Sequence, residues 1–399
     1  MLIAWRDRRE EKCMNTQNSI RIGQSCAHDA REAAREFHAA VAQPGMGLVV
    51  FFCSSAYDLD ALAEEMDRLF AGVQVVGCTT AGEIGPLGCL EHSVSGASFP
   101  AGEFTAVSGR IEHLQQFEIT KGQAFAEAQL QRLESMAPQA TPQNSFALLL
   151  IDGLSIREEP VTRALQNALG RLPLIGGSAG DGLNFDRTHV YFGGRFHSDS
   201  AAMILVSTPL PFRLFKIQHF VPTEERLVVT AADIAHRIVA EINGLPAAEE
   251  YARVVGVGAH DLDAMRFAAS PVVVLIDGMN YVRSIQKVNP DGSLTFFCAI
   301  EEGLVLRVAY GLDLLANMEQ SFAALQTEIG PPQLVLGCDC ILRKLEIMQS
   351  GLTEHVCEVF RYHNTVGFNT YGEQFRGIHV NQTLTGIAIG ATHPELRNG

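Results

Sequence analysis

The chain has few charged residues and no concentration of positive charge. Only 19% of its 399 residues are charged, and 30 Lys and Arg stand against 45 Asp and Glu, which gives a formal net charge of −15. Nucleic-acid binding requires a concentrated basic face, and no basic run in the sequence supplies one. The composition therefore argues against a nucleic-acid partner.

Long apolar runs and a regular cysteine framework are also missing. No segment approaches the roughly 20 uninterrupted apolar residues of a membrane span. Residues 1–20 look like an N-terminal extension, charged after the first five residues and without an apolar signal core. We therefore expect a cytoplasmic protein. The nine cysteines are odd in number and dispersed through apolar segments, which predicts reduced, buried thiols rather than disulfides.

An internal duplication is the strongest pattern in the sequence. VGCTTAGE at 76–83 and VGFNTYGE at 366–373 share the spacing Val-Gly-x-x-Thr-x-Gly-Glu at an offset of 290 residues. The match extends without a gap over 76–99 and 366–389 and includes a further shared glycine. Such an extended match predicts a repeated structural unit.

The segments before these turns read as strand–helix–strand units. LVVFFC (48–53) predicts a buried strand, and the helical spacing of apolar residues over 59–69, with Asp58 as the cap, predicts a helix before the next strand. ALLLID (147–152) and LVLGCDC (334–340) begin similar units. In each unit the glycine-rich segment follows the carboxyl end of a strand, where open α/β sheets place ligands.

The segment between the second and third units has a different pattern. Residues 230–243 predict a helix that begins at Thr230 and ends at Gly244, and PVVVLI (271–276) and the segment after Asp291-Gly292 predict antiparallel strands. With a boundary at 221–222, we expect domains over 21–221 and 222–399. The predicted fold is α/β, with duplicated strand–helix–strand units forming mixed sheets in two halves and added antiparallel strands in the C-terminal half.

The repeated turn matches neither a P-loop nor a dinucleotide-binding loop, because no Lys-Ser/Thr follows and no helix begins there. It is either a tight turn in which Glu caps backbone amides, or the lining of a ligand cleft. In the second interpretation Thr80, Thr370 and Tyr371 offer hydroxyl groups. Phe368, Asn369 and Tyr371 differ from the first copy, so ligand specificity is expected there.

Cysteine and histidine side chains offer several alternative sites. Cys78 stands at a strand end like a nucleophile, but a buried structural thiol explains it as well. Cys338 and Cys340 share one face of a strand and predict either two core cysteines or a zinc site. Zinc would need two further ligands, and His355, Cys357 and His363 are the nearby candidates.

His219 and His379 are the histidines whose positions suggest a function. His219 lies at the predicted domain junction, and His379 shares a polar strand face with Asn381, Thr383 and Thr385. A buried haem needs a neutral imidazole and a large apolar cavity, which a sequence does not display. A histidine satisfied by its neighbours is the alternative for each.

The chain resembles the FIST family of two-part sensor domains. VVGCTTAGEI and LIGGSAGDG are similar to FIST N, and RIVAEINGLPAAEEY and GFNTYGEQF with NQTLTGIAIG are similar to FIST C. The resemblance implies a small-ligand sensor coupled to a histidine kinase or another signalling protein. It also implies that the chain is not an enzyme.

Within that family the chain resembles the NosP group of nitric oxide sensors. That resemblance implies haem b bound through His219 or His379, near Phe368 and Tyr371, and control of a histidine kinase in two-component or cyclic-di-GMP signalling. The alternative is a FIST sensor of a small metabolite such as an amino acid, held by Thr80, Thr370 and Asn381. Zinc at Cys338 and Cys340 and a homo-oligomeric state stay open.

Overall fold

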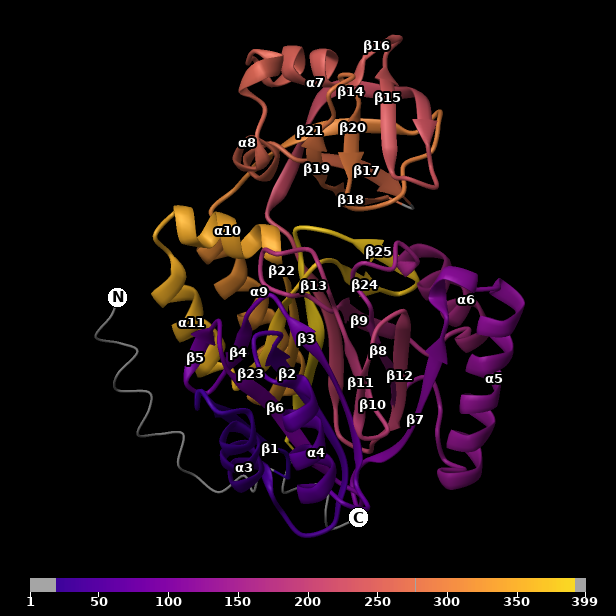
Figure 1. Cartoon of the computed structure of the whole chain (residues 1–399), viewed down its shortest axis with the longest axis vertical. Helices are drawn as coiled ribbons and strands as arrows, with labels where there is room; N and C mark the ends of the chain where they lie inside the picture. Colours follow the sequence, from indigo (N-terminus) through magenta and orange to yellow (C-terminus); the bar gives the residue numbers. More distant parts are fainter. Residues whose placement is uncertain (1–18, 277, 392–399) are drawn as a thin grey trace.

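A computed structural model describes residues 19–276 and 278–391, so most of the predicted N-terminal extension lies outside the described residues. Over these ranges the chain forms three six-stranded mixed sheets and one eight-stranded antiparallel sheet. The three six-stranded sheets build the main body, and the fourth lies apart from it at the top of Figure 1. The predicted α/β class is confirmed.

The first sheet shows how the strand–helix–strand units are built. Only β2 and β3 are parallel, and α4 (Leu59–Leu69) connects them, with the Asp58 side chain accepting from the amide of Ala61. α3 (Ala30–Val41) precedes β2. The strand order is β1 (Arg21–Ser25), β6 (Val94–Pro100), β2 (Met46–Ser54), β3 (Gln74–Thr80), β10 (Val190–Phe192) and β11 (Arg195–His197).

The second sheet repeats this order. Its parallel pair is β8 and β9, connected by α6 (Glu158–Leu169), and α5 (Ile119–Met136) packs outside it. The strand order is β7 (Thr105–Glu112), β12 (Ser200–Ser207), β8 (Ser145–Ile151), β9 (Leu174–Ser178), β24 (Glu373–Phe375) and β25 (Ile378–Val380).

The third sheet has the same plan. Its parallel pair is β22 and β23, connected by α10 (Ile341–Gln349) and α11 (Thr353–Tyr362), while α9 (Leu314–Ile329) precedes β22. The strand order is β13 (Phe212–Ile217), β26 (Leu384–Gly390), β22 (Pro332–Cys340), β23 (Thr365–Thr370), β4 (Glu83–Gly85) and β5 (Gly88–Leu90).

Each sheet ends in a hairpin that comes from another unit. The β4–β5 hairpin of the first unit joins the third sheet, β10–β11 of the second joins the first, and β24–β25 of the third joins the second. The offset of 290 residues carries β4, β5 and β6 onto β24, β25 and β26, so the predicted duplication is present element by element. The exchange makes the three units one interlocked body.

The fourth sheet is an insertion in the third unit, here called the inserted domain (residues 220–311). It includes α7 (Ala247–Val255) and α8 (Ala264–Ala269), and the predicted antiparallel strands at 271–276 and after Asp291-Gly292 are present. Because β13 precedes the insertion and β22 follows it, the third sheet crosses the boundary predicted at 221–222. Its strands are β14 (Phe220–Asp233), β15 (Ile238–Ile242), β16 (Leu245–Pro246), β17 (Val272–Ile276), β18 (Met279–Arg283), β19 (Ile285–Val288), β20 (Leu294–Phe296) and β21 (Val305–Gly311).

The prediction of a helix over 230–243 is wrong. The segment is the end of β14, a turn, and β15, which pairs with β14 and β20. Val239 and Ile242 are buried in the inserted domain, so sheet packing outweighs the helical spacing of the apolar residues. Asn243 and Gly244 both have positive φ and turn the chain into β16, and this Asn-Gly pair was the available hairpin signal.

The prediction of reduced thiols is wrong for one pair of cysteines. Cys89 in β5 forms a disulfide with Cys357 in α11, 268 residues away. The exchanged hairpin brings them together, which no local pattern reveals. Of the other described cysteines, Cys26 is exposed and five are buried thiols.

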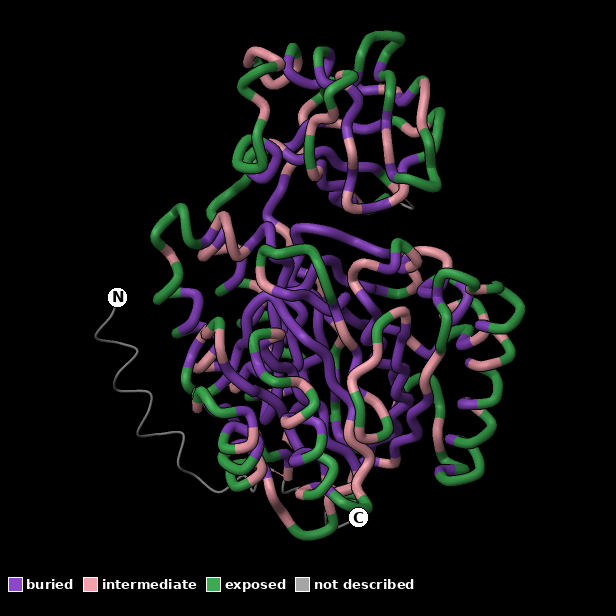
Figure 2. Tube along the Cα trace, in the orientation of Figure 1, coloured by how far each residue is buried: buried purple, intermediate pink, exposed green. Residues whose placement is uncertain are grey.

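Burial follows the sheets. Figure 2 shows buried backbone concentrated in the strands of the main body and exposed residues on its outer helices. In the described part of the chain, no helix combines the length and apolar character that crossing a membrane requires.

Candidate functional site

The three glycine-rich turns meet and bond to one another at the centre of the main body. The contacts between units are backbone hydrogen bonds from Gly180 N to Thr79 O (2.9 Å), from Ala81 N to Asn369 O (2.9 Å) and from Tyr371 N to Ser178 O (3.3 Å). Because these amides and carbonyls are used between units, the turns hold the units together.

The glutamate of each repeated turn accepts hydrogen bonds from the residue ten positions later, which is equivalent in the two copies. Glu83 accepts from the amide and hydroxyl of Ser93 at 3.0 and 2.9 Å, and Glu373 accepts from those of Thr383 at 3.1 and 2.7 Å. Burial raises the pKa of Glu83 to about 7 and that of Glu373 well above its usual value. Both carboxyl groups are fully buried and act in the architecture of the turn.

The predicted ligand hydroxyls of Thr80 and Thr370 serve the same turns. Thr80 Oγ1 donates to Glu83 and accepts from the amide of Gly82 at 3.2 Å. Thr370 Oγ1 lies 2.7 Å from Ser178 O and accepts from the amide of Gly372 at 3.2 Å. These contacts favour the tight-turn interpretation for both threonines.

Phe368 and Cys78 lie in the core. The ring of Phe368 stacks on Phe52 with the centroids 4.5 Å apart, and both rings are fully buried. Burial raises the pKa of the Cys78 thiol well above its usual value, which disfavours the thiolate that a nucleophile requires. The structural-thiol interpretation of Cys78 is the one that this environment favours.

Cys338 and Cys340 are buried thiols in β22. Burial raises the pKa of both, so the thiolate form that binds zinc is disfavoured. Cys357, a predicted further ligand, is held in the disulfide. Across 19–276 and 278–391, no group of three His, Cys, Asp or Glu side chains is arranged to hold a metal ion.

His219 belongs to a buried polar network beside the entry to the inserted domain. Its Nε2 lies 2.7 Å from Glu346 Oε1, and Arg343 Nη1 lies 3.5 Å from its Nδ1. Arg343 in turn donates to Asp339 at 2.7 Å. Because both ring nitrogens have partners, His219 is poorly suited to bind iron.

His379 and Asn381 lie close together beside the backbone of Gly372. Gln374 Nε2 lies 3.3 Å from His379 Nδ1, whereas His379 Nε2 and both polar atoms of the Asn381 side chain have no hydrogen-bond partner within the described residues. A Cβ at Gly372 would lie 2.2 Å from Cε1 of His379, so glycine makes room for the imidazole. Burial lowers the pKa of His379 to about 4, which keeps the ring neutral.

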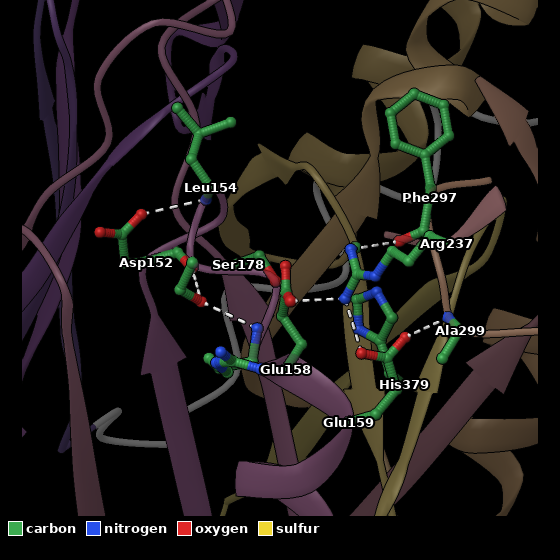
Figure 3. A network of polar contacts seen from close by, with 12 residues as sticks. Asp152, Leu154, Glu158, Glu159, Ser178, Arg237, Phe297, Ala299 and His379 are labelled. Atoms are coloured by element: carbon green, nitrogen blue, oxygen red, sulfur yellow. Dashed lines mark hydrogen bonds and ion pairs between the residues drawn. The ribbon is translucent and has the colours of Figure 1, made fainter. Parts of the chain in front are cut away.

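An ion cluster joins the inserted domain to the main body near His379 (Figure 3). Arg237, in the turn between β14 and β15, places Nη2 2.7 Å from Glu158 Oε2 and 2.6 Å from Glu159 Oε2. The amide of Ala299 donates to Glu159 at 2.7 Å, and Arg237 Nη1 donates to Phe297 O at 2.8 Å. We call Arg237, Glu158 and Glu159 the junction cluster.

The two carboxylates of the junction cluster have opposite pKa shifts. Burial raises the pKa of Glu158 to about 7 despite the attraction of Arg237. Burial acts on Glu159 in the same direction, but His379, Arg237 and the amide of Ala299 outweigh it and lower the pKa to about 2. Glu158 is therefore the carboxyl group that changes charge near neutral pH.

A cavity of about 140 Å³ opens beside the junction cluster, here called the junction cavity. Among the predicted site residues, Tyr371 lines it. The Tyr371 hydroxyl donates to Asp181, and its ring stacks on Phe185 with the centroids 4.5 Å apart. The other polar and aromatic lining residues are Glu158, Phe185, Arg237, His236, Gln286, Thr295, Phe296 and Phe297.

The residues of the junction cluster were not predicted from the sequence. Arg237 fell in the predicted helix, and acidic residues such as Glu158 and Glu159 are usual in the first turn of a helix, where they favour the helix dipole. The Asn243-Gly244 signal would have moved Arg237 into a hairpin turn. No local signal indicates that this turn reaches α6.

Haem bound through His219 or His379 would not lie in either of the two cavities described in this structure. Neither the junction cavity nor a second cavity of about 280 Å³ is lined by His219 or His379. Drug-sized ligands usually occupy roughly 300–1,000 Å³, and haem is larger than most of them. The neutral imidazole of His379 is a suitable iron ligand by itself, but polar side chains and the ion cluster surround it.

Three exchanged α/β units with an inserted antiparallel domain define a concatenated α/β protein with a polar junction between its two parts. The FIST N domain model matches residues 47–245, and the FIST C domain model matches residues 247–376. The chain belongs to the FIST family, whose domains are sensors in signal transduction. No curated protein matches the sequence.

Solved structures show distant similarity. The structure described as "Cyanuric acid hydrolase: evolutionary innovation by structural concatenation" has a TM-score of 0.38 and 9% identity, covering 94% of this chain and 99% of that one. A cyanuric acid hydrolase from A. caulinodans has a TM-score of 0.35 and 10% identity, covering 93% and 98%. At such low TM-scores and sequence identities, the similarity says nothing about the activity of this chain.

Proposed function

We propose that this FIST protein senses a small metabolite with an ammonium group, such as an amino acid, in the junction cavity. The observation that carries the proposal is the pairing of a buried carboxyl group, Glu158, with aromatic rings in one small cavity between the two parts of the molecule. A cavity of about 140 Å³ suits a ligand of amino-acid size.

The lining supplies the contacts that an ammonium group needs. Ionised Glu158 accepts a charge-assisted hydrogen bond, and the rings of Phe297 and Tyr371 offer faces for a cation–π contact. Arg237 positions Glu158, since its guanidinium lies 2.7 Å from that carboxylate. A carboxylate or hydroxyl on the ligand would find donors in Gln286 and Thr295.

The position of the cavity suggests how binding is transmitted. The two chain segments that connect the inserted domain to the main body lie side by side. Phe220 pairs with Gly311, and the amide of Leu312 donates to His219 O at 2.8 Å. A ligand that contacts both parts would therefore change the angle at this connection. We propose that a partner signalling protein, such as a histidine kinase in two-component or cyclic-di-GMP signalling, responds to that change.

A thermal-shift screen of amino acids and small amines against the full chain tests the proposal. A ligand should raise the melting temperature, and Glu158→Gln should abolish the shift, while Glu64→Gln on the exposed face of α4 should keep it. Because the pKa of Glu158 is about 7, affinity should increase as pH rises past that value. Binding that is unaffected by Glu158→Gln would overturn the site.

Haem-based nitric oxide sensing is the second candidate, and the free Nε2 of the neutral His379 imidazole favours it. The protein would be incubated with haem, and the absorption spectrum recorded for the wild type, His379→Ala and His219→Ala. A Soret band that shifts with nitric oxide and is lost in one variant would support haem and identify its ligand. Protein that takes up no haem would exclude this candidate.

A further inference from the structure

We propose that the second cavity of about 280 Å³ binds a small organic acid, with the apolar part of the acid inside and its carboxylate at Lys344. We call it the seam cavity, because its walls come from the β4–β5 hairpin of the first unit and from α10 and α11 of the third. It is separate from the junction cavity, and no residue lines both.

Most of the wall of the seam cavity is hydrocarbon. Ile84 and Leu90 line it from the exchanged hairpin, and Ile347, Val356 and Phe360 line it from the helices. The Cys89–Cys357 disulfide lies in the same wall and fixes the hairpin against α11. Filling this cavity with an apolar group removes hydrocarbon surface from water, which favours binding by roughly 25 cal/mol per Å².

Lys344 supplies one positive charge at the polar end of the seam cavity. Its Nζ donates to Ala81 O and to Glu91 Oε1, both at 2.8 Å. The side chain of Glu91 is 74% exposed, whereas that of Lys344 is 18% exposed. Because the Glu91 end of the pair is exposed to solvent, the pair contributes about 1 kcal/mol, and a ligand carboxylate displaces Glu91 at little cost.

The buried charges beside the seam cavity are already paired with each other, which leaves Lys344 as the cation that a ligand can reach. Asp339 lines the cavity, but its carboxylate already accepts from Arg343 Nε at 2.7 Å, and both side chains are buried. Arg343 Nη2 has no hydrogen-bond partner among the described residues, but the charge of Arg343 is balanced by Asp339. An incoming carboxylate replaces the charge of Glu91 and leaves the local balance unchanged.

Calorimetric titration of the full chain with benzoate and octanoate tests the proposal, with benzamide and acetate as matched probes. Benzamide keeps the ring and loses the charge, and acetate keeps the charge and loses the apolar part. Binding of benzoate and octanoate but of neither matched probe is expected. Equal binding of benzoate and benzamide, or no heat from either acid at millimolar concentration, would overturn the proposal.

Two variants of the ion pair should shift the affinity in opposite directions. Lys344→Met should weaken benzoate binding by about tenfold, and Glu91→Gln should strengthen it several-fold, because the competing carboxylate is gone. Lys121→Met, in an exposed pair with Glu118 at 2.6 Å, is the control and should change nothing. If Lys344→Met is unstable, Glu91→Gln decides: unchanged affinity in that exposed variant contradicts the proposal.

The junction-cavity proposal and this one fail independently. Glu158→Gln should leave benzoate binding unchanged, and Glu91→Gln should leave amine binding unchanged. Loss of benzoate binding in Glu158→Gln would assign the acid to the junction cavity and reject the seam cavity.

Discussion

Arg237 Nη2 lies 2.7 Å from Glu158 Oε2, although 79 residues separate them and they belong to different parts of the molecule. The same nitrogen reaches Glu159 at 2.6 Å, so two adjacent carboxylates, the buried Glu158 and the partly exposed Glu159, share one guanidinium. The contact fixes the inserted domain over α6 and forms one side of the junction cavity. Its removal is therefore expected to affect both stability and ligand binding.

Arg237→Met should lower the free energy of unfolding by about 3 kcal/mol, because the buried Glu158 and the partly exposed Glu159 lose their cation. Without Arg237 the folded-state pKa values of Glu158 and Glu159 rise, so the loss should be largest above neutral pH and shrink as pH falls. Urea denaturation between pH 5 and pH 8 measures both effects.

Arg213→Met is the control for Arg237→Met, since Arg213 pairs with Glu328 at 2.6 Å and both side chains are more than half exposed. It should cost less than about 1 kcal/mol. An equal, pH-independent loss in both variants would mean that the junction cluster contributes nothing beyond a surface ion pair.

Glu83→Gln should stabilise the protein at alkaline pH. Because burial raises the folded-state pKa of Glu83 to about 7, the protonated acid stabilises the fold below its unfolded pKa, and this stability is lost as pH rises through 7. The amide keeps an oxygen for Ser93 and never ionises, so at pH 8 the gain should approach about 3 kcal/mol. Chemical denaturation of both proteins at pH 5 and pH 8 should show a much larger difference at pH 8; a constant difference would contradict the assigned pKa.

Local patterns in the sequence predicted the repeated strand–helix–strand units. They did not predict the exchange of hairpins, which depends on strand pairing between distant segments. The helix after Asp58 and the strands around it follow from apolar spacing and one capping carboxylate. The two copies of the turn follow from the offset of 290 residues. The exchange of hairpins depends on strand edges from distant segments, which carry no periodicity of their own.

The site was harder to predict than the fold for a physical reason. Tyr371 was found because its position differs between the two copies of a recognisable turn. Arg237 and Glu158 meet only because the inserted domain folds back over α6, so their pairing depends on tertiary packing. Thr80 and Thr370 resembled ligand hydroxyls because a turn-capping hydroxyl and a ligand-binding one have the same residue type and spacing.

Reduction of the disulfide should destabilise the protein. Cys89–Cys357 closes a long loop and joins the first unit to the third, so its loss should lower the free energy of unfolding by about 2–4 kcal/mol. A phosphine reductant should lower the melting temperature of the wild type and leave the Cys89→Ser/Cys357→Ser variant unchanged. Identical melting of the oxidised and reduced wild type would show that the crosslink does not stabilise the seam.

Tyr371→Phe should weaken the loop around Asp181 without closing the junction cavity. The Tyr371 hydroxyl donates to the Asp181 carboxylate, which also accepts from the amides of Phe185 at 2.9 Å and Arg187 at 2.8 Å. Burial acts to raise the pKa of Asp181, but the hydroxyl and these amides outweigh it and lower the pKa. A hydrogen bond to a charged group contributes about 1.5–3 kcal/mol, so a loss of this size is expected at neutral pH.

The loss in Tyr371→Phe should depend on pH in a defined direction. Since the folded-state pKa of Asp181 is lowered, its stabilising effect is present above its unfolded pKa and disappears as pH falls through the folded value. Tyr57→Phe is the matched control, because that hydroxyl donates to the neutral carbonyl of Ala27 at 2.8 Å. Urea denaturation from pH 3 to pH 7 should therefore show a pH-dependent difference for Tyr371→Phe and a constant one for Tyr57→Phe. Parallel curves for both variants would mean that the Tyr371 hydroxyl does not hold the Asp181 carboxylate.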